Sequence, residues 1–289
     1  MYEKLEVCPI CKNTNFKNFL ICKDHSVSGE SFALNQCTKC SLIFTNPRPG
    51  QQSLGKYYES EQYISHSNKS NSVVNFIYKQ VRNYTIRQKI KLIRKYTRGT
   101  SLLDFGCGTG EFLAQCTKSG FKTFGYEPNE NASNQATSKG LSIIQNLKDL
   151  NQKMDAITAW HVVEHVPTLR DTIKDLKKKL SKDGILFIAV PNVDSFDARH
   201  YKEYWAAYDV PRHLYHFSQN SFGKLIAKCK LHLVDTIPMK FDSYYVSLLS
   251  EKYLDGKNDF ISALRIGYQS NYQAQKNREY SSLIYVLKK

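Results

Sequence analysis

The chain has 289 residues, 41% of them hydrophobic, which is enough for one full α/β domain with a small appendage and too apolar for a disordered chain. No run approaches the length of a membrane span and residues 1–9 lack the apolar segment of a signal peptide, so we expect a cytoplasmic protein with no membrane partner. The net charge of +15 raises the alternative of nucleic-acid binding, but the basic residues are scattered, and two modest clusters, 89–98 and 174–182, have the apolar periodicity of solvated helices.

Two Cys-x-x-Cys pairs lie near the start of the chain, on either side of a short β-rich loop: Cys8, Cys11, Cys37 and Cys40. Four thiolates so paired can close a tetrahedral Zn²⁺ site, which leaves no open position for a substrate and is therefore structural. Disulfides are the alternative, but nothing in the sequence points to an oxidising compartment. Cys22, with Asp24 and His25 nearby, could supply a further ligand, although a loop position is the simpler interpretation.

A proline-marked turn ends the stretch 40–49, and we place the boundary of a zinc-ribbon-like segment, residues 1–49, at that turn. Residues 50–98 have apolar side chains mostly at helix-like spacing, which predicts a helical lead-in to the next domain. We expect that domain to occupy residues 99–289.

The most informative stretch is 101–113, which reads SLLDFGCGTGEFL. It predicts a short buried strand over 102–105, a glycine turn over 106–110 and a helix that starts at Glu111. Glycines are needed in such a turn because a ligand must approach the backbone closely, where a Cβ would stand in the way. The next predicted strand ends in Glu127, and a carboxylate at that tip can accept hydrogen bonds from both hydroxyls of a ribose.

Strands and helices then alternate regularly. We predict seven strands, over 102–105, 123–126, 141–144, 155–160, 185–190, 231–237 and 283–287. A helix over 169–180 is predicted to end with the C-cap signal Asp183-Gly184. Between the last two strands, 242–282 contains two helix-like stretches, 244–254 and 261–271, which we interpret as a cap or as the contact of a homodimer.

The motif Asp-Phe-Gly-Cys-Gly-Thr-Gly, followed by Gly-Tyr-Glu-Pro, resembles the class I S-adenosylmethionine-dependent methyltransferases. The glycine spacing of dinucleotide-binding proteins, Gly-x-Gly-x-x-Gly, does not match this turn. The resemblance implies an α/β fold with a Rossmann-like seven-stranded sheet, mostly parallel, whose antiparallel last strand is inserted beside the fifth. It implies that the helical lead-in covers the cofactor, so Tyr63 or His66 could line the site. The residues implied to contact S-adenosyl-L-methionine are Asp104, Gly106, Cys107, Gly108, Gly110, Phe112, Glu127, Pro128, Trp160 and His161.

The fourth predicted strand leads into His161, Glu164 and His165, spaced i, i+3 and i+4 at the edge of the sheet where ligands bind. The Glu-His pair resembles that of quinone-biosynthesis O-methyltransferases and several sugar methyltransferases. In the quinone enzymes an acidic residue takes the place of His161, and the set binds a divalent cation. A His-Glu-His set suits a borderline metal or metal-free acid/base work instead. The plainer alternative is that Glu164 and His165 only hydrogen-bond the loop.

After the fifth strand, an aromatic-rich excursion ends in Pro211-Arg212-His213-Leu-Tyr-His216-Phe. This stretch resembles one found in methyltransferases that carry a zinc ribbon, many of them among polysaccharide- and sugar-modification genes. His213 is the preferred general base, because an imidazole can take a hydroxyl proton near neutral pH, and Arg212 could bind a phosphate or carboxylate. Alternatively, His213 and His216 are buried imidazoles that pin the loop.

The residues and the resemblance together predict an enzyme that transfers a methyl group to a small polar acceptor, most readily a hydroxyl of a saccharide, a nucleotide-linked sugar or a related metabolite. The acceptor oxygen would attack the methyl carbon in line while His213 or His161 removes its proton. Three alternatives stay open: an RNA or protein methyltransferase that docks through the ribbon and the basic surface, a sugar C-methyltransferase (a type that usually carries a further C-terminal domain), and a cofactor-binding scaffold without catalysis.

Overall fold

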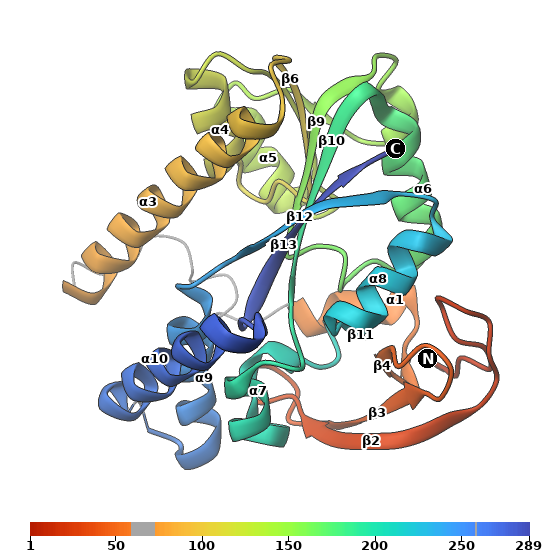
Figure 1. Cartoon of the computed structure of the whole chain (residues 1–289), viewed down its shortest axis with the longest axis vertical. Helices are drawn as coiled ribbons and strands as arrows, with labels where there is room; N and C mark the ends of the chain where they lie inside the picture. Colours follow the sequence, from red (N-terminus) through yellow and green to blue (C-terminus); the bar gives the residue numbers. More distant parts are fainter. Residues whose placement is uncertain (59–72, 258) are drawn as a thin grey trace.

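The computed structural model describes residues 1–58, 73–257 and 259–289, and within them it contains two main sheets (Figure 1). The larger sheet has seven strands, and a four-stranded sheet lies below it in this view, beside the N-terminus. None of the described helices combines the length and the apolar composition that a membrane crossing needs.

The seven-stranded sheet has the order β12-β13-β10-β9-β6-β7-β8. Its strands are β6 (Ser101–Phe105), β7 (Lys122–Tyr126), β8 (Ile143–Ile144), β9 (Met154–Trp160), β10 (Leu180–Pro191), β12 (His232–Pro238) and β13 (Ser282–Lys288). The last strand, β13, runs antiparallel between β10 and β12, and the other pairings are parallel. The predicted fold class and the predicted place of the last strand are therefore confirmed.

Helices cover both faces of this sheet because its strands are apolar on both faces. Leu102 of β6 lies in the core shared with α3, α4 and α5, whereas its neighbour Leu103 lies in the core shared with α6 and α8. These helices are α3 (Val73–Tyr96), α4 (Glu111–Lys118), α5 (Glu130–Ser138), α6 (Leu169–Lys179) and α8 (Gln219–Lys228). The alternation brings the carboxyl ends of β6, β7, β9 and β10 to one edge, where the candidate site lies.

The predicted role of Asp183-Gly184 as a helix cap is wrong. Helix α6 ends at Lys179, and the chain enters β10 at once, so the pair lies inside the strand. The β9–β10 register is irregular between Leu180 and Ile185, and a Cβ on Gly184 would lie 2.7 Å from the carbonyl oxygen of Met154. The glycine is needed for a close backbone approach, not for a helix end.

The smaller sheet joins the N-terminal segment to the second half of the chain. Its order is β11-β4-β3-β2, from β2 (Phe16–Lys23), β3 (Ser31–Cys37), β4 (Ile43–Thr45) and β11 (Tyr215–His216), and a short pair, β1 (Tyr2–Glu3) with β5 (Arg48–Pro49), lies beside it. Strand β11 comes from the Pro-Arg-His stretch that follows β10. The segment 1–49, which the sequence presents as a separate ribbon, thus shares a sheet with the large domain.

The insertion 242–282 is helical, as expected. It contains α9 (Asp242–Asp255) and α10 (Phe260–Asn277), which pack on α7 (Phe196–Tyr201) and on two short 3-10 helices, η3 (Lys202–Tyr204) and η4 (Ala206–Tyr208). Buried Asp197 accepts hydrogen bonds from Trp205 Nε1 at 2.8 Å and from the hydroxyls of Ser270 and Ser281. This carboxylate ties the excursion after β10 to the insertion. Of the lead-in, α1 (Gln51–Leu54), η1 (Gly55–Tyr58) and α3 are described, whereas Tyr63 and His66 lie outside the described residues.

Candidate active site

The glycine turn after β6 takes backbone conformations that favour glycine. Gly106, Gly108 and Gly110 have φ values of 79°, 54° and 82°. A Cβ on Gly106 would lie 2.4 Å from Cγ2 of Val162, but a Cβ on Gly108 would have no atom of the described residues within 4 Å. Gly106 is therefore needed for packing, while the space over Gly108 is open to a ligand. This cradle fits a cofactor that contacts the backbone.

Two carboxylates flank this turn. Glu127, just after β7, accepts hydrogen bonds from the backbone N–H groups of Gly108 and Asn129, each at 2.9 Å. Asp104 is buried and accepts a hydrogen bond from the hydroxyl of Thr158 at 2.7 Å, and burial raises the pKa of its carboxyl to about 6. Glu127 is thus held against the glycine turn by two backbone N–H groups, whereas Asp104 is buried and bonded to Thr158 of β9.

An aromatic wall closes the other side of the cradle. Trp160, at the end of β9, makes an edge-to-face contact with Phe112 at 5.6 Å between ring centroids, and Nζ of Lys89 lies 4.4 Å from the Trp160 ring. The buried Nε1 of Trp160 has no hydrogen-bond partner among the described residues. The structure thus brings the implied cofactor residues to one edge of the sheet: Asp104, Gly106, Cys107, Gly108, Gly110, Phe112, Glu127, Pro128, Trp160 and His161.

His161 lies between two carboxylates at the centre of this edge. Its Nδ1 is 3.3 Å from Oε1 of Glu164, and its Nε2 is 3.1 Å from Oδ2 of Asp242. Burial alone would lower the pKa of His161, but hydrogen bonds with Asp242 and Glu164 raise it to about 9. A histidine that is already protonated at neutral pH cannot take a proton, so this geometry argues against His161 as the base.

Glu164, His165 and His213 converge beside His161. One ligand atom from each lies within 4.8 Å of the others, so this trio, rather than the predicted set that included His161, is the group that could hold a metal. Glu164 is fully buried, and its Oε2 has no partner in the part of the chain that the structure describes. Burial would raise the pKa of its carboxyl, but the hydrogen bond from His161 lowers it, so Glu164 is an anion at the floor of the site.

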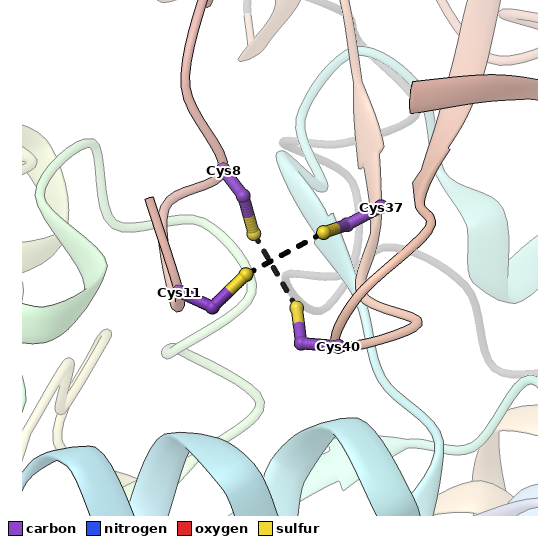
Figure 2. A group of neighbouring side chains, drawn as sticks. All are labelled: Cys8, Cys11, Cys37 and Cys40. Carbon is purple, nitrogen blue, oxygen red and sulfur yellow. Dashed lines mark hydrogen bonds between the residues drawn. The ribbon is translucent and has the colours of Figure 1, made fainter. Parts of the chain in front are cut away.

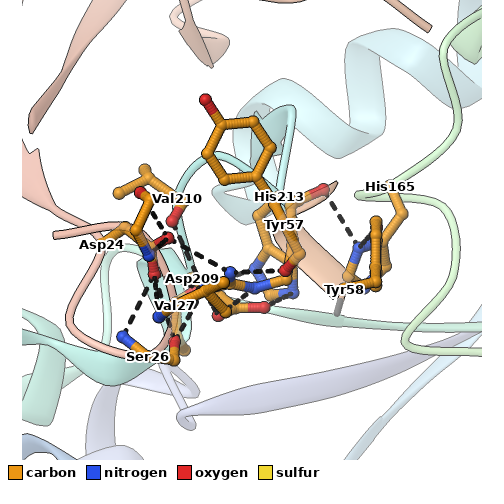
Figure 3. A network of polar contacts seen from close by, with 12 residues as sticks. Asp24, Ser26, Val27, Tyr57, Tyr58, His165, Asp209, Val210 and His213 are labelled. Atoms are coloured by element: carbon orange, nitrogen blue, oxygen red, sulfur yellow. Dashed lines mark hydrogen bonds and ion pairs between the residues drawn. The ribbon is translucent and has the colours of Figure 1, made fainter. Parts of the chain in front are cut away.

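Backbone carbonyls fix the tautomers of the two histidines in this trio. Nδ1 of His165 lies 3.1 Å from the carbonyl oxygen of Arg212 and 3.2 Å from the hydroxyl of Tyr58, and Nδ1 of His213 lies 2.8 Å from the carbonyl oxygen of Ala207 (Figure 3). Because a carbonyl can only accept, each Nδ1 carries the proton, so the lone pair of either ring in its neutral form is on Nε2. Burial, with the neighbouring His213, lowers the pKa of His165 to about 4.

Arg212 does not face a ligand. Its side chain is 1% exposed, and every guanidinium contact described is to protein: Asp24 at 2.9 Å, Asp209 at 2.7 Å, Ser26 at 2.7 Å and the carbonyl oxygen of Tyr57 at 2.9 Å. The geometry thus gives no support to the prediction that Arg212 binds an acceptor phosphate or carboxylate. His216 is also buried, with Nε2 3.3 Å from the hydroxyl of Thr45, which matches the alternative of an imidazole that pins the loop.

Sequence reasoning missed four side chains of this region. Asp242 is the first residue of α9, Lys89 lies on α3, Tyr58 ends η1, and Asp24 lies in the β2–β3 turn. Each reaches the site from a distant segment, and no local pattern marks it. In the sequence Asp24 stands out only as a neighbour of Cys22, and neither residue belongs to the cysteine group that could hold a metal.

The four cysteines form a compact group at the other end of the ribbon (Figure 2). The Sγ atoms of Cys8 and Cys40 are 3.4 Å apart and those of Cys11 and Cys37 are 3.5 Å apart, close to the roughly 3.8 Å that four thiolates about 2.3 Å from one Zn²⁺ require. The two turns are alike: Lys12 and Ser41, at φ 62° and 63°, each follow the second cysteine of a pair and donate the backbone N–H to the carbonyl of the first. The residues present fit a tetrahedral metal site.

Comparisons with known proteins agree with this fold. The ubiquinone biosynthesis O-methyltransferase of Actinobacillus pleuropneumoniae serotype 5b (strain L20) is 33% identical over 109 residues, which are 32% of this chain and 47% of that protein. The enzyme of the same description from Haemophilus ducreyi is 32% identical over 110 residues, 32% of this chain and 46% of that protein. The chain thus spans about half the length of the curated relatives it matches.

A solved structure of magnesium protoporphyrin IX methyltransferase from Synechocystis PCC 6803 with bound S-adenosylhomocysteine superposes with a TM-score of 0.55. It is 14% identical, and the match covers 82% of this chain and 99% of that one, so the likeness is one of fold. The family model described as a methyltransferase domain matches residues 78–235, more than half of the chain. The chain therefore belongs to this methyltransferase domain family.

Proposed function

We propose that the protein transfers the methyl group of S-adenosyl-L-methionine to a small polar acceptor. The observation that carries the proposal is the pairing, at one edge of the sheet, of a glycine cradle open over Gly108 with two neighbouring imidazoles, the buried His213 and the partly buried His165. Glu127 would accept from the ribose hydroxyls, and the backbone of the turn would contact the methionine part. The cofactor, when bound, supplies an electrophilic methyl group.

The acceptor group that these residues suit best is a hydroxyl. As the new C–O bond forms, the hydroxyl proton must leave, and a neutral imidazole can take it. With a pKa of about 4, His165 is too weak a base for this step, and His161 is already a cation. We therefore assign the base to His213: its Nδ1 donates to the carbonyl oxygen of Ala207, so the ring would accept a proton at Nε2, which lies 3.9 Å from Oδ2 of Asp209.

A saccharide, a nucleotide-linked sugar or a related hydroxylated metabolite stays our preferred acceptor, on the resemblance of the Pro-Arg-His stretch alone. The cysteine group is proposed to hold one structural Zn²⁺, on the match of its Sγ distances to a tetrahedral site. The cytoplasmic location, the homodimer through 242–282 and the alternatives of nucleic-acid or protein acceptors remain predictions from the sequence.

Calorimetric titration with S-adenosylhomocysteine tests the cofactor part. We expect Glu127→Ala to weaken binding by about 1–3 kcal/mol, because the ribose loses hydrogen bonds to a charged acceptor. Glu130→Ala, an exposed carboxylate three residues along, is the matched control and should bind like wild type. If the wild-type protein does not bind S-adenosylhomocysteine, the proposal is wrong.

The acceptor is then sought by incubating the enzyme and the methyl donor with pools of hydroxylated metabolites and recording the mass gain of one methyl group. His213→Gln should abolish that gain while S-adenosylhomocysteine still binds. Methylation that continues undiminished in His213→Gln would contradict the assignment of the base.

A further inference from the structure

The turn of the ribbon hairpin, residues 24–28, is built around one buried carboxylate. Asp24 follows β2 and is 1% exposed. Its Oδ1 accepts from the backbone N–H groups of Ser26 and Val27, at 3.1 and 3.2 Å, and its Oδ2 accepts from that of Ser28 at 2.8 Å. Burial would raise the pKa of Asp24, but hydrogen bonds from Arg212 and Ser28 lower it, so the group is a fixed anion.

This anion is paired with Arg212, which comes from the other domain. Nη2 of Arg212 lies 2.9 Å from Oδ1 of Asp24 and 2.7 Å from the hydroxyl of Ser26, so the hairpin turn supplies two of its partners. Asp209 and the carbonyls of Tyr57 and Val210 supply the others that orient the guanidinium plane. Figure 3 shows Asp24, Ser26, Tyr57 and Asp209 close together. A cation this deeply buried keeps its position only while its ion-pair and hydrogen-bond partners are present.

Arg212 also contacts the histidines, through its backbone. Its carbonyl oxygen is 3.1 Å from Nδ1 of His165 and sets the tautomer of that ring. The backbone N–H of His213 donates to the carbonyl oxygen of Asp209 at 2.9 Å, and Asp209 is held by the Arg212 side chain. Tyr57, whose carbonyl accepts from Arg212, precedes Tyr58, whose hydroxyl also reaches Nδ1 of His165.

A second attachment runs through β4 of the ribbon. The hydroxyl of Thr45 donates to the carbonyl oxygen of His213 at 2.9 Å, and the backbone N–H of Thr45 donates to the carbonyl of Leu214 at 3.1 Å. Strand β11 then continues the ribbon sheet at Tyr215 and His216. The ribbon therefore holds the base-bearing segment at both its side chains and its backbone.

We propose that the hairpin turn 24–28 of the ribbon is a positioning element of the acceptor site, with Asp24 acting through Arg212 to fix the orientation and tautomer of His165 and the place of His213. The assignment rests on the proposed function in that these imidazoles face the acceptor. It gives the ribbon a part in the reaction that differs from docking a macromolecule. Because Asp24 would act through Arg212, it is a positioning residue.

Long-range ¹H–¹⁵N NMR of protein labelled at histidine tests this at a single pH of 7.5, because the cross-peak pattern reports which ring nitrogen carries the proton. The His165→Gln variant assigns the His165 signals. We expect wild-type His165 to show one tautomer, protonated at Nδ1, and Asp24→Asn to convert this pattern to a mixture of the two. Glu3→Gln is the matched control, because Glu3 also pairs a ribbon carboxylate with a buried arginine, Arg48, that does not contact the histidines.

Zinc content and S-adenosylhomocysteine binding are measured on the same samples and should equal those of wild type in both variants. If Asp24→Asn fails to fold, Ser26→Ala takes its place, because it leaves the Asp24 carboxylate and removes the hydroxyl that accepts from Arg212 at 2.7 Å and donates to Oδ1 of Asp24 at 3.3 Å. A His165 and His213 pattern unchanged in a folded Asp24 or Ser26 variant would overturn the inference. If the wild-type protein does not bind S-adenosylhomocysteine, the proposed function is contradicted instead, so the two failures are distinguishable.

Discussion

The cofactor side and the acceptor side of the candidate site are built in opposite ways. Residues 104–128, one βαβ unit, supply most of the cofactor side, and they do so largely through backbone conformation. The acceptor side collects residues from five separate segments, 24–28, 57–58, 161–165, 209–213 and 242, and joins them by ion pairs and hydrogen bonds. The comparison teaches that the acceptor side depends on tertiary structure and should fail first when distant contacts are removed.

Removal of the ribbon metal is expected to have the largest effect. Structural zinc sites contribute on the order of 10 kcal/mol to the folding of small domains, so Cys37→Ser should unfold the ribbon and release β11 and Arg212. The chain has two tryptophans, Trp160 on the cofactor side and Trp205 on the acceptor side. Fluorescence of the Trp160→Phe and Trp205→Phe forms of the variant reports on each side alone. We expect a red shift for Trp205 and little change for Trp160.

Cys22→Ser provides the control for this experiment, because Cys22 is a buried ribbon cysteine outside the metal group. It should retain one zinc per chain and wild-type fluorescence. Equal red shifts of both tryptophans in Cys37→Ser would show that the two sides unfold as one unit. That result would contradict the expectation that the acceptor side fails first.

Two alanine substitutions within the glycine turn should separate packing from ligand contact. Gly106→Ala places a Cβ 2.4 Å from Val162 at a positive φ, so we expect it to lower the free energy of unfolding by about 2–3 kcal/mol. Gly108→Ala meets no atom of the described residues within 4 Å and should cost only about 1 kcal/mol, the price of its positive φ. Its methyl group would nevertheless fill the cradle and weaken S-adenosylhomocysteine binding at least about tenfold.

Urea unfolding and calorimetric titration of both variants provide the measurement. Wild-type affinity in Gly108→Ala would mean that the cofactor does not approach this glycine, and the cradle would have to be placed elsewhere. Equal losses of stability in the two variants would contradict the assignment of Gly106 to packing.

The sequence predicts the locally encoded cofactor side better than the acceptor side. The strands and the glycine turn could be predicted because each is encoded in short contiguous patterns, whereas the place of β13 in the sheet is implied only by the resemblance to class I methyltransferases. The ion pair of Asp24 with Arg212, 188 residues apart, could not, because no local pattern links a hairpin turn to a loop of another domain. The sequence also leaves open whether a histidine is a base or a cation. His161 is a cation because Asp242, from a distant helix, lies 3.1 Å from its Nε2 and acts together with Glu164 to raise its pKa.

The smallest predicted effect is on pH dependence, and it arises on the acceptor side. The pKa of His161 is about 9 in the folded protein, above the ordinary value of 6.5. Protonated His161 therefore contributes its full stabilisation to the folded state below pH 6.5, and this contribution is lost as pH rises towards 9. Because His161 is partly exposed to solvent, we expect a loss on the order of 1–2 kcal/mol rather than the full value of the shift. Urea unfolding between pH 6.5 and 9 measures it, and His161→Gln should flatten the profile.

Below pH 6.5, titrating groups on the two sides change the free energy of unfolding in opposite directions. The range above pH 6.5 is therefore the cleaner test. The pKa of His165 is about 4, so its contribution is complete above pH 6.5 and is lost as pH falls towards 4. Asp104, on the cofactor side, has a pKa of about 6, so its contribution is complete below its ordinary pKa near 4 and is lost as pH rises through 6. A falling stability from pH 6.5 to 9 that persists in His161→Gln would mean that the His161 ion pairs with Glu164 and Asp242 do not hold the acceptor side together.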